Sequence, residues 1–193
     1  MDKLYYREIR LKNTQDFSVN FIRNKVMSVL HLVFANEINS NSSRTGITFP
    51  KYDLKGHCLG NVIRLFNTSK EALEKFFNEP RFFMLKEFMY FSEIQQVPDN
   101  IKEYVRYSRA VIKTEGSTVK RYAKMQKISL DAAHAFFKDR KWKFCKLPYL
   151  ALKSQTTKQN FKLFIKEEIC SHANEEVQFS SYGLQKNGYL PKF

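Results

Sequence analysis

The sequence predicts an α+β protein built from two parts. Residues 1–97 are expected to form a ferredoxin-like (RRM-like) domain, because their hydrophobic periods follow the order strand, helix, strand, strand, helix, strand. Residues 98–193 are expected to form a second α+β domain with a basic helix and a three-stranded antiparallel sheet, because two helical patterns there are followed by alternating runs. The tripeptide Val97-Pro98-Asp99 favours a boundary between the two parts.

The first part begins with alternation of apolar and polar residues over positions 4–12, which predicts a strand. The period becomes helical from about Ser18 to Asn39, and a single apolar stripe there is typical of a helix packed on a sheet. The stripe consists of Ile22, Val26, Val29, Leu30, Val33, Phe34 and Ile38. A short strand is expected over positions 46–50, where Pro50 ends it.

The remainder of this part repeats the same order. Residues 61–66 predict a strand, and Thr68 with Glu71 forms a capping-box pattern that opens a helix through Phe77. A fourth strand is expected around positions 87–94. The third strand lacks the aromatic residues of the RNA-recognition signature, so this sheet is not expected to be an RNA platform.

The second part is expected to begin with a strand and two helices. Alternation predicts the strand, Lys and Arg at helical spacing predict a basic helix, and a Ser at the N-cap opens the second helix. Three strands follow, with Asn187-Gly188 as a tight turn before the last one. The expected bounds of the first three elements are Tyr104–Val111, Ser117–Lys127 and Ser129–Lys141.

Charge is the strongest signal in the composition. The chain has 193 residues and a formal net charge of +14, which predicts a polyanionic partner because Lys and Arg release counterions when they neutralise phosphates. No apolar run approaches the roughly 20 residues that span a bilayer, so nucleic acid is favoured over a membrane. The three cysteines are widely spaced and form no zinc pattern, so we expect no metal and a reducing, cytoplasmic setting.

Two local features suggest chemistry. The turn over residues 154–160 consists of hydroxyls, amides and one cation, which suits a phosphate and a stacked base, although an ordinary solvated hairpin loop has the same composition. His31 lies nearly opposite the apolar stripe of its helix, among small or polar neighbours. It therefore faces either solvent or a second body, such as the carboxy-terminal half or RNA.

The basic helix presents cations along one face, since Lys120, Lys124 and Lys127 repeat at helical spacing with Arg121 beside them. Such a face is either simply solvated or binds phosphates. A DNA-binding regulator would also carry this charge, but the sequence contains no recognition-helix motif.

Two motifs in the last quarter of the chain resemble a known family. One contains Ser154-Gln155-Thr156-Thr157, Gln159, Phe161 and Leu163-Phe164-Ile165, and the other contains Ser181-Tyr182-Gly183-Leu184, Gly188 and Pro191-Lys192-Phe193. Both are similar to the CRISPR repeat-processing endoribonuclease of type I-F systems, the RNA-cutting subunit of the Csy complex. Weaker similarity spans nearly the whole chain.

The resemblance implies a metal-independent endoribonuclease without a cofactor. It would bind the CRISPR repeat stem-loop, cut precursor RNA at its 3′ side by attack of a 2′-hydroxyl, and stay on the guide RNA with the other subunits of the surveillance complex.

Catalytic roles follow from matching positions. The family's helical histidine corresponds to His31 as general base, Ser154 would hold the 2′-hydroxyl, and Tyr182 would orient the imidazole. A competing register, aligned on the stretch 27–30, places Ala35 at the histidine position. In that case the protein would be a catalytically silent RNA-binding subunit.

RNA-binding roles follow in the same way. Thr156 would contact the scissile phosphate, Phe161 would stack at the foot of the hairpin, and Arg109 would read a guanine. Val111 replaces a glutamine of the relatives, so the base pairs that are read are expected to differ. The implied RNA-binding set is Arg109, Lys113, Lys120, Arg121, Lys124, Lys127, Gln155, Thr156 and Phe161.

Overall fold

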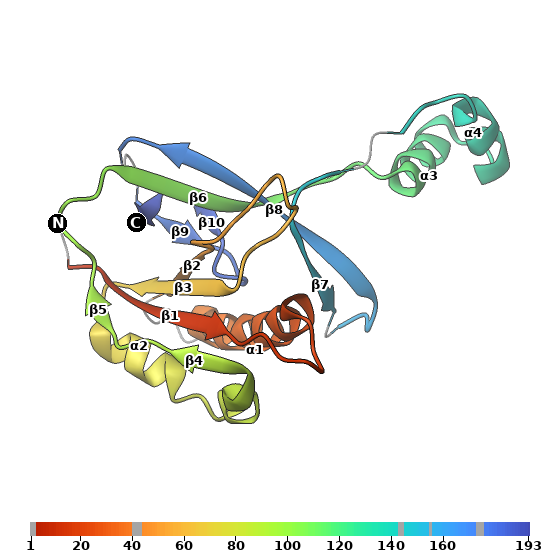
Figure 1. The fold of residues 1–193 in the computed structure, drawn as a ribbon. Coiled ribbons are helices and arrows are strands. Elements are labelled where there is room, and N and C mark those ends of the chain that lie inside the picture. The colour runs from red at the N-terminus through yellow and green to blue at the C-terminus, as the bar shows by residue number, and fades with distance from the viewer. Residues whose placement is uncertain (1–2, 40–43, 143–144, 155, 173–175) are drawn as a thin grey trace. The chain divides into compact units, whose positions relative to one another are not determined.

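The computed structural model describes residues 3–39, 44–142, 145–154, 156–172 and 176–193 (Figure 1). The chain forms two compact units, one of residues 1–110 with 147–193 and one of residues 111–146. These units do not divide at the boundary expected after residue 97. The strand that follows this position pairs with another strand of the larger unit. That the two predicted parts are separate domains stays a prediction.

The first half has the ferredoxin-like topology that was predicted. Its sheet has the order β2-β3-β1-β4 with antiparallel pairing throughout, and β5 adds to β1. Phe34 of α1 and Phe76 of α2 lie 5.3 Å apart between ring centroids, within the core that also holds Ile9 and Ile63 of the sheet. The elements are β1 (Tyr5–Leu11), α1 (Val19–Asn39), β2 (Gly46–Thr48), β3 (Val62–Asn67), α2 (Lys70–Phe77), β4 (Met89–Phe91) and β5 (Gln95–Gln96). None of the helices in the described ranges is long and apolar enough to cross a membrane.

Two local predictions in this half were wrong. The N-cap of α2 is Ser69 and not Thr68, because the Ser69 backbone is extended and its Oγ accepts the Ala72 N–H at 3.0 Å. The fourth strand is shorter than expected, because residues Pro80–Phe88 form a 3₁₀ helix that leaves only Met89–Phe91 for pairing with β1.

The second sheet has four strands in the order β11-β6-β8-β7, one more than predicted. The additional member is β6, which was predicted as a strand but not as part of this sheet, and which pairs on one side with β8 and on the other with the last strand of the chain. β9 and β10 pair with each other and form a separate two-stranded sheet. The strands are β6 (Glu103–Ala110), β7 (Tyr149–Lys153), β8 (Asn160–Cys170), β9 (Gln178–Phe179), β10 (Gln185–Asn187) and β11 (Leu190–Lys192).

Gln185 joins the two large sheets. Its side chain is 2% exposed, its Nε2 donates to the Ile47 carbonyl at 2.8 Å, and its Oε1 accepts the Tyr107 N–H at 2.6 Å. These bonds link β2 of the first sheet to β6 of the second, because β10 lies between them. The apolar side chains of both sheets accordingly belong to a single core.

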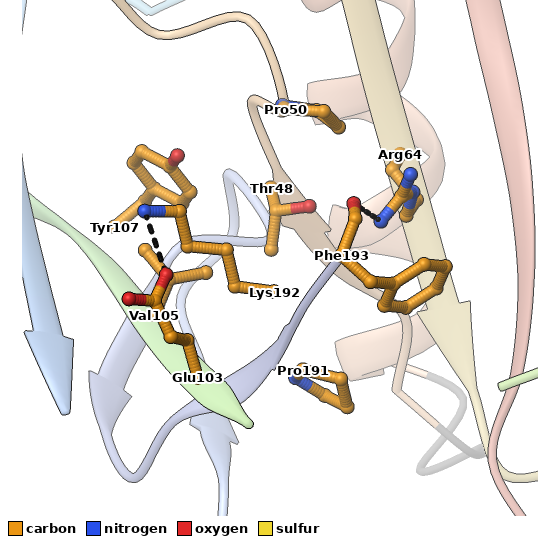
Figure 2. A pocket seen from close by; sticks show the side chains of 9 residues that line it. All are labelled: Thr48, Pro50, Arg64, Glu103, Val105, Tyr107, Pro191, Lys192 and Phe193. Carbon is orange, nitrogen blue, oxygen red and sulfur yellow. Dashed lines mark hydrogen bonds and ion pairs between the residues drawn. The ribbon is translucent and has the colours of Figure 1, made fainter. Parts of the chain in front are cut away.

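A cavity of about 220 Å³ lies beside this junction (Figure 2). Its charged side chains are paired within the protein: Lys192 Nζ lies 3.3 Å from the Glu103 carboxylate, and Arg64 donates to the Phe193 carbonyl at 2.7 Å. We therefore assign no ligand to this cavity.

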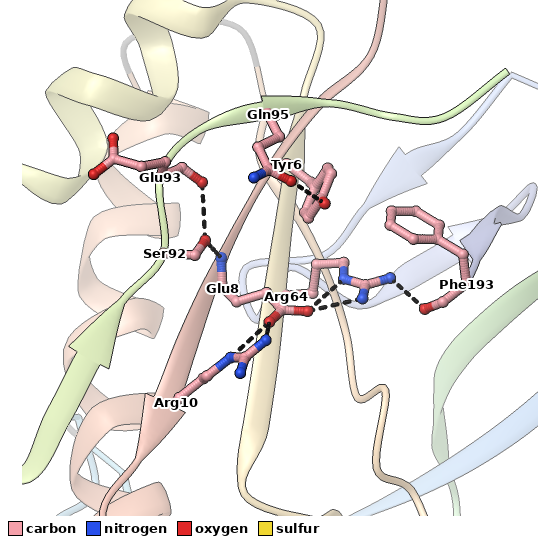
Figure 3. A network of polar contacts seen from close by, with 8 residues as sticks. All are labelled: Tyr6, Glu8, Arg10, Arg64, Ser92, Glu93, Gln95 and Phe193. Atoms are coloured by element: carbon pink, nitrogen blue, oxygen red, sulfur yellow. Dashed lines mark hydrogen bonds and ion pairs between the residues drawn. The ribbon is translucent and has the colours of Figure 1, made fainter.

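Glu8 is the centre of a buried ionic network on the first sheet (Figure 3). Its carboxylate accepts hydrogen bonds from Arg64 on one oxygen and from Arg10 on the other. Each arginine donates two bonds, and the shorter of the two is 2.8 Å long in both cases. The Arg64 guanidinium also lies 3.9 Å from the centroid of the Phe193 ring. A charge at this depth is tolerated because both carboxylate oxygens are bonded to cations.

Glu8→Gln is expected to lower the free energy of unfolding by about 3 kcal/mol, because the buried guanidinium of Arg64 loses its anion. Burial raises the pKa of Glu8, but the hydrogen bonds and charges of Arg64 and Arg10 outweigh burial and hold the pKa below its ordinary value of 4.5. A lowered pKa in the folded state stabilises the protein above pH 4.5, and this stabilisation is lost as the pH falls through the folded-state pKa.

Urea unfolding at several pH values measures both effects. The wild type should lose stability below about pH 4.5, and the variant should lose less over the same range. Glu93→Gln, at an exposed neighbour, is the control and should change stability by less than about 0.5 kcal/mol. Equal stability of both variants would contradict the role of Glu8.

The smaller unit is a pair of helices. α3 (Glu115–Gln126) is capped by Thr114 and α4 (Leu130–Phe137) by Ser129, whose Oγ accepts the Ala132 N–H at 3.1 Å. Val119 and Ala123 of α3 are buried with Ala133 of α4. The Ser129 cap was predicted correctly, and the basic helix lies where it was expected, although it begins at Glu115.

Candidate active site

His31 is held on α1 by a backbone group from the far end of the chain. Its Nδ1 lies 2.7 Å from the carbonyl oxygen of Ser181. A carbonyl only accepts hydrogen bonds, so Nδ1 carries the hydrogen. In the neutral ring, Nε2 therefore bears the lone pair and is able to take up a proton.

Tyr182 stacks on the imidazole of His31. The ring centroids lie 4.1 Å apart and the planes differ by 9°. Burial raises the pKa of Tyr182 and the charge of Arg109 opposes this rise, so the phenol remains protonated at neutral pH. The stacked ring restricts rotation of the imidazole, which complements the single hydrogen bond at Nδ1.

The loop that carries Tyr182 is fixed by backbone contacts. Gly183 has φ of +69°, and its N–H donates to the Ser180 carbonyl at 2.9 Å. Its carbonyl accepts the Ile47 N–H at 2.8 Å, which anchors the loop to β2. A Cβ at this position would lie 2.6 Å from Cζ of Phe34 on α1, so only glycine allows the loop to lie this close to the helix.

The polar turn between β7 and β8 is closed by Ser154. Its N–H donates to the Gln159 carbonyl at 2.9 Å, its carbonyl accepts the Lys158 N–H at 3.0 Å, and its Oγ accepts the Thr157 N–H at 3.1 Å. The Ser154 side chain is thus held in one orientation. Gln155, which was predicted to bind RNA, lies outside the described residues.

Helix α1, the loop that carries Tyr182 and the polar turn between β7 and β8 line one cavity of about 430 Å³. The structure brings six predicted site residues together in its lining: His31, Arg109, Ser154, Thr156, Phe161 and Tyr182. Sequence reasoning missed four further lining residues, although all belong to the same turn or border it: Lys153, Thr157, Gln159 and Asn160. The lining contains His31 and not Ala35, which favours the first of the two registers.

A hydrogen bond from β7 to α1 joins two elements that carry residues of this cavity. β7 is the edge strand of its sheet, and the Ala151 N–H donates to Oδ1 of Asn24 at 3.1 Å. Asn24 lies about two helical turns before His31, on the same face of α1. The strand that leads into Ser154 is therefore tied to the helix that carries the histidine.

The remaining predicted RNA-binding residues belong to the smaller unit and are exposed. Lys120, Arg121 and Lys124 lie on α3, away from the residues that pack on α4. Lys127 ends the helix in a left-handed conformation with φ of 54°, and Lys113 precedes the Thr114 cap. The cationic helical face predicted from spacing is thus present in the fold.

Comparison with known proteins identifies the family. The family model described as CRISPR-associated protein (Cas_Csy4) matches residues 6–193. This chain belongs to the Cas_Csy4 family. The resemblance seen in the two carboxy-terminal motifs is confirmed, and the match extends over both halves of this Cas_Csy4 chain.

A curated relative of this Cas_Csy4 chain is the CRISPR-associated endonuclease Cas6/Csy4 of Pseudomonas aeruginosa (strain UCBPP-PA14). It is 27% identical over 190 residues, which cover 98% of this chain and 99% of the relative. Among solved structures, the CRISPR endoribonuclease Cse3 bound to 19 nt RNA matches 86% of this chain and 83% of its own, at 9% identity and a TM-score of 0.39.

Proposed function

We propose that this Cas_Csy4 protein is an endoribonuclease that binds the repeat stem-loop of precursor CRISPR RNA and cuts it at the 3′ side. The observation that carries the proposal is the cavity in which His31, Ser154 and Tyr182 meet, although they come from distant parts of the sequence. Family membership and the endonuclease name of the relative support it.

The chemistry uses a nucleophile that RNA itself provides. Nε2 of His31 takes the proton of the ribose 2′-hydroxyl, and the 2′-oxygen attacks the adjacent phosphorus. The bond from phosphorus to the 5′-oxygen breaks, and this oxygen takes a proton from water or from the imidazolium of His31 and leaves as a 5′-hydroxyl. The products are a 2′,3′-cyclic phosphate and a 5′-hydroxyl, and no step requires a metal ion.

The neighbours of His31 support this role. The Ser181 carbonyl stabilises the imidazolium that forms, because Nδ1 keeps its hydrogen bond when the ring is charged. Ser154 would align the 2′-hydroxyl, Thr156 would contact the phosphate, and the cation of Arg109 would favour an anion in the cavity.

The RNA hairpin would be bound by cationic and aromatic side chains. Lysines on α3 would bind phosphates as point charges, and the ring of Phe161 would stack on the nucleotide at the foot of the hairpin stem. Retention of the guide RNA and entry into a complex with other Csy subunits follow as part of the same proposal.

Single-turnover cleavage of a labelled repeat hairpin tests the function. We expect a single cut in the hairpin, no cut in a scrambled duplex of equal length, and no cut when the nucleotide before the scissile phosphate lacks its 2′-hydroxyl. Cleavage of the deoxy substrate at the normal rate would contradict the mechanism. Tight binding of the hairpin without any cut would indicate a silent RNA-binding subunit.

Asn24 provides a test of how the cavity is held together. Asn24→Leu removes the acceptor for the Ala151 N–H, so the hairpin is freed from α1 and the cleavage rate is expected to fall about tenfold or more. Asn24→Asp keeps an acceptor oxygen at this position and should restore most of the rate. The measurement is the single-turnover rate at saturating protein, with hairpin affinity measured in parallel. Equal rates for the two variants would contradict the positioning role.

A further inference from the structure

The four-stranded sheet has an inner face and an outer face of different character. Along β7, Leu150 and Leu152 are buried, whereas Tyr149 and Lys153 are exposed. The register pairs Tyr149 with Phe164 of β8, so both side chains lie on the outer face. Phe161 and Arg109, which line the candidate active site, pair with Leu152 and Ile165 and so belong to the inner face. Tyr149 and Phe164 thus lie on the opposite face from Phe161 and Arg109, and Lys153 lies at the border, because it also lines the candidate active site.

Aromatic rings lie open on the outer face beside a cation. Tyr149 is 42% exposed, and its ring centroid lies 5.4 Å from that of Phe164. Nζ of Lys162 lies 4.5 Å from the centroid of the Tyr149 ring. An exposed ring with a cation at its side is the combination that proteins use to stack a nucleic-acid base next to its phosphate.

The charge of this face is positive. Lys153, Lys162 and Lys166 are exposed there, and Arg106 of β6 lies on the same face because it pairs with Glu168. Glu168 is the one acidic side chain among the outer-face residues of β6, β7 and β8 in the described chain, and it binds both Arg106 and Lys166. A surface with this balance favours a polyanion.

We propose that the outer face of this sheet binds a single-stranded segment of RNA, with bases stacked on Tyr149 and Phe164 and phosphates bound by Lys162 and Lys166. The inference rests on the proposed function in one respect, which is that the polyanion is RNA. A single-stranded end beside a hairpin would present the bases and phosphates that this face is suited to bind.

Fluorescence anisotropy with a labelled, unstructured RNA of about 12 nucleotides tests the proposal. Tyr149→Ala is expected to weaken binding of this probe about tenfold, the usual loss of one stacked base. A double variant, Lys162→Gln with Lys166→Gln, should reduce the slope of log affinity against log salt by about 1.4, because two phosphate contacts are lost. Both variants should bind a hairpin without single-stranded flanks as the wild type does.

Tyr90 offers a matched control. Its ring is 63% exposed with Nζ of Lys12 at 4.3 Å, but it lies on β4. Tyr90→Ala should leave single-strand binding unchanged, and an equal loss in Tyr90→Ala and Tyr149→Ala would overturn the inference. Binding of a poly-glutamate peptide as tight as that of RNA, and equally weakened in Tyr149→Ala, would overturn it in favour of an acidic protein partner. If the wild type binds the single strand but neither binds nor cuts the hairpin, the proposed nuclease fails and the outer-face site is supported.

Discussion

His31→Ala is expected to slow single-turnover cleavage of the repeat hairpin by about 10³-fold, because the reaction loses its general base. The fold should persist, since the imidazole lies at the cavity and not in the apolar core. Hairpin affinity should stay close to that of the wild type, because most of the binding free energy is expected from cations elsewhere. The substitution is therefore expected to lower the cleavage rate at saturating protein and to leave the dissociation constant of the hairpin close to that of the wild type.

His134→Ala is the matched control, since this histidine is exposed on α4 and contributes nothing to the cavity lining. It should cleave at the wild-type rate. A His31→Ala protein with more than about a tenth of the wild-type rate would contradict the assignment of the general base, since such a base contributes at least about 10²-fold. Loss of folding, seen by circular dichroism, would instead assign His31 a structural role.

Gly183→Ala is expected to lower the free energy of unfolding by about 3 kcal/mol and the melting temperature by roughly 10 °C. Two causes add. The backbone at φ of +69° is strained for any residue with a Cβ, and the new methyl group would lie 2.6 Å from Cζ of the buried Phe34. Relief of the clash requires the loop to move from α1, which displaces Tyr182 from His31. Cleavage should therefore fall at temperatures at which the variant is still folded.

Gly116→Ala separates this effect from the general effect of replacing glycine. Gly116 lies in the first turn of α3, and apart from its chain neighbours and the nearby backbone of the helix, no atom lies within 4 Å of the position of a new Cβ. We expect no loss of stability there, and a gain of up to about 1 kcal/mol. Thermal unfolding of both variants decides the matter, and equal melting temperatures would contradict the close approach of the loop to α1.

Local patterns predicted the elements whose signals are contained in a few residues. Alternation placed β1 and β6 within a residue or two, and the hydroxyl of Ser129 correctly marked the start of α4. The cap of α2 was misplaced because Thr68 and Ser69 are adjacent hydroxyl residues and only the backbone conformation decides between them. The 3₁₀ helix was missed, and its last two residues, Glu87 and Phe88, were assigned to the strand that follows, because their pattern continues into Met89–Phe91.

The candidate site was predictable where side chains define it. The polar turn was evident from its composition, and its pairing with His31 came from the resemblance. The contacts that assemble the site were not predictable, because they involve backbone groups: the Ser181 carbonyl holds His31, and the Ala151 N–H binds Asn24. A backbone partner leaves no residue-type signal in the sequence. The outer face of the second sheet was missed because it emerges only from the register of β7 against β8.

The cavity of His31, Ser154 and Tyr182 is proposed to cut RNA through the 2′-hydroxyl of the substrate. Mass spectrometry of the products formed from the repeat hairpin in excess EDTA tests it most directly. We predict a 2′,3′-cyclic phosphate on the upstream fragment and a 5′-hydroxyl on the downstream fragment. A 3′-hydroxyl with a 5′-phosphate, or products that form only when a divalent metal is restored, would contradict it.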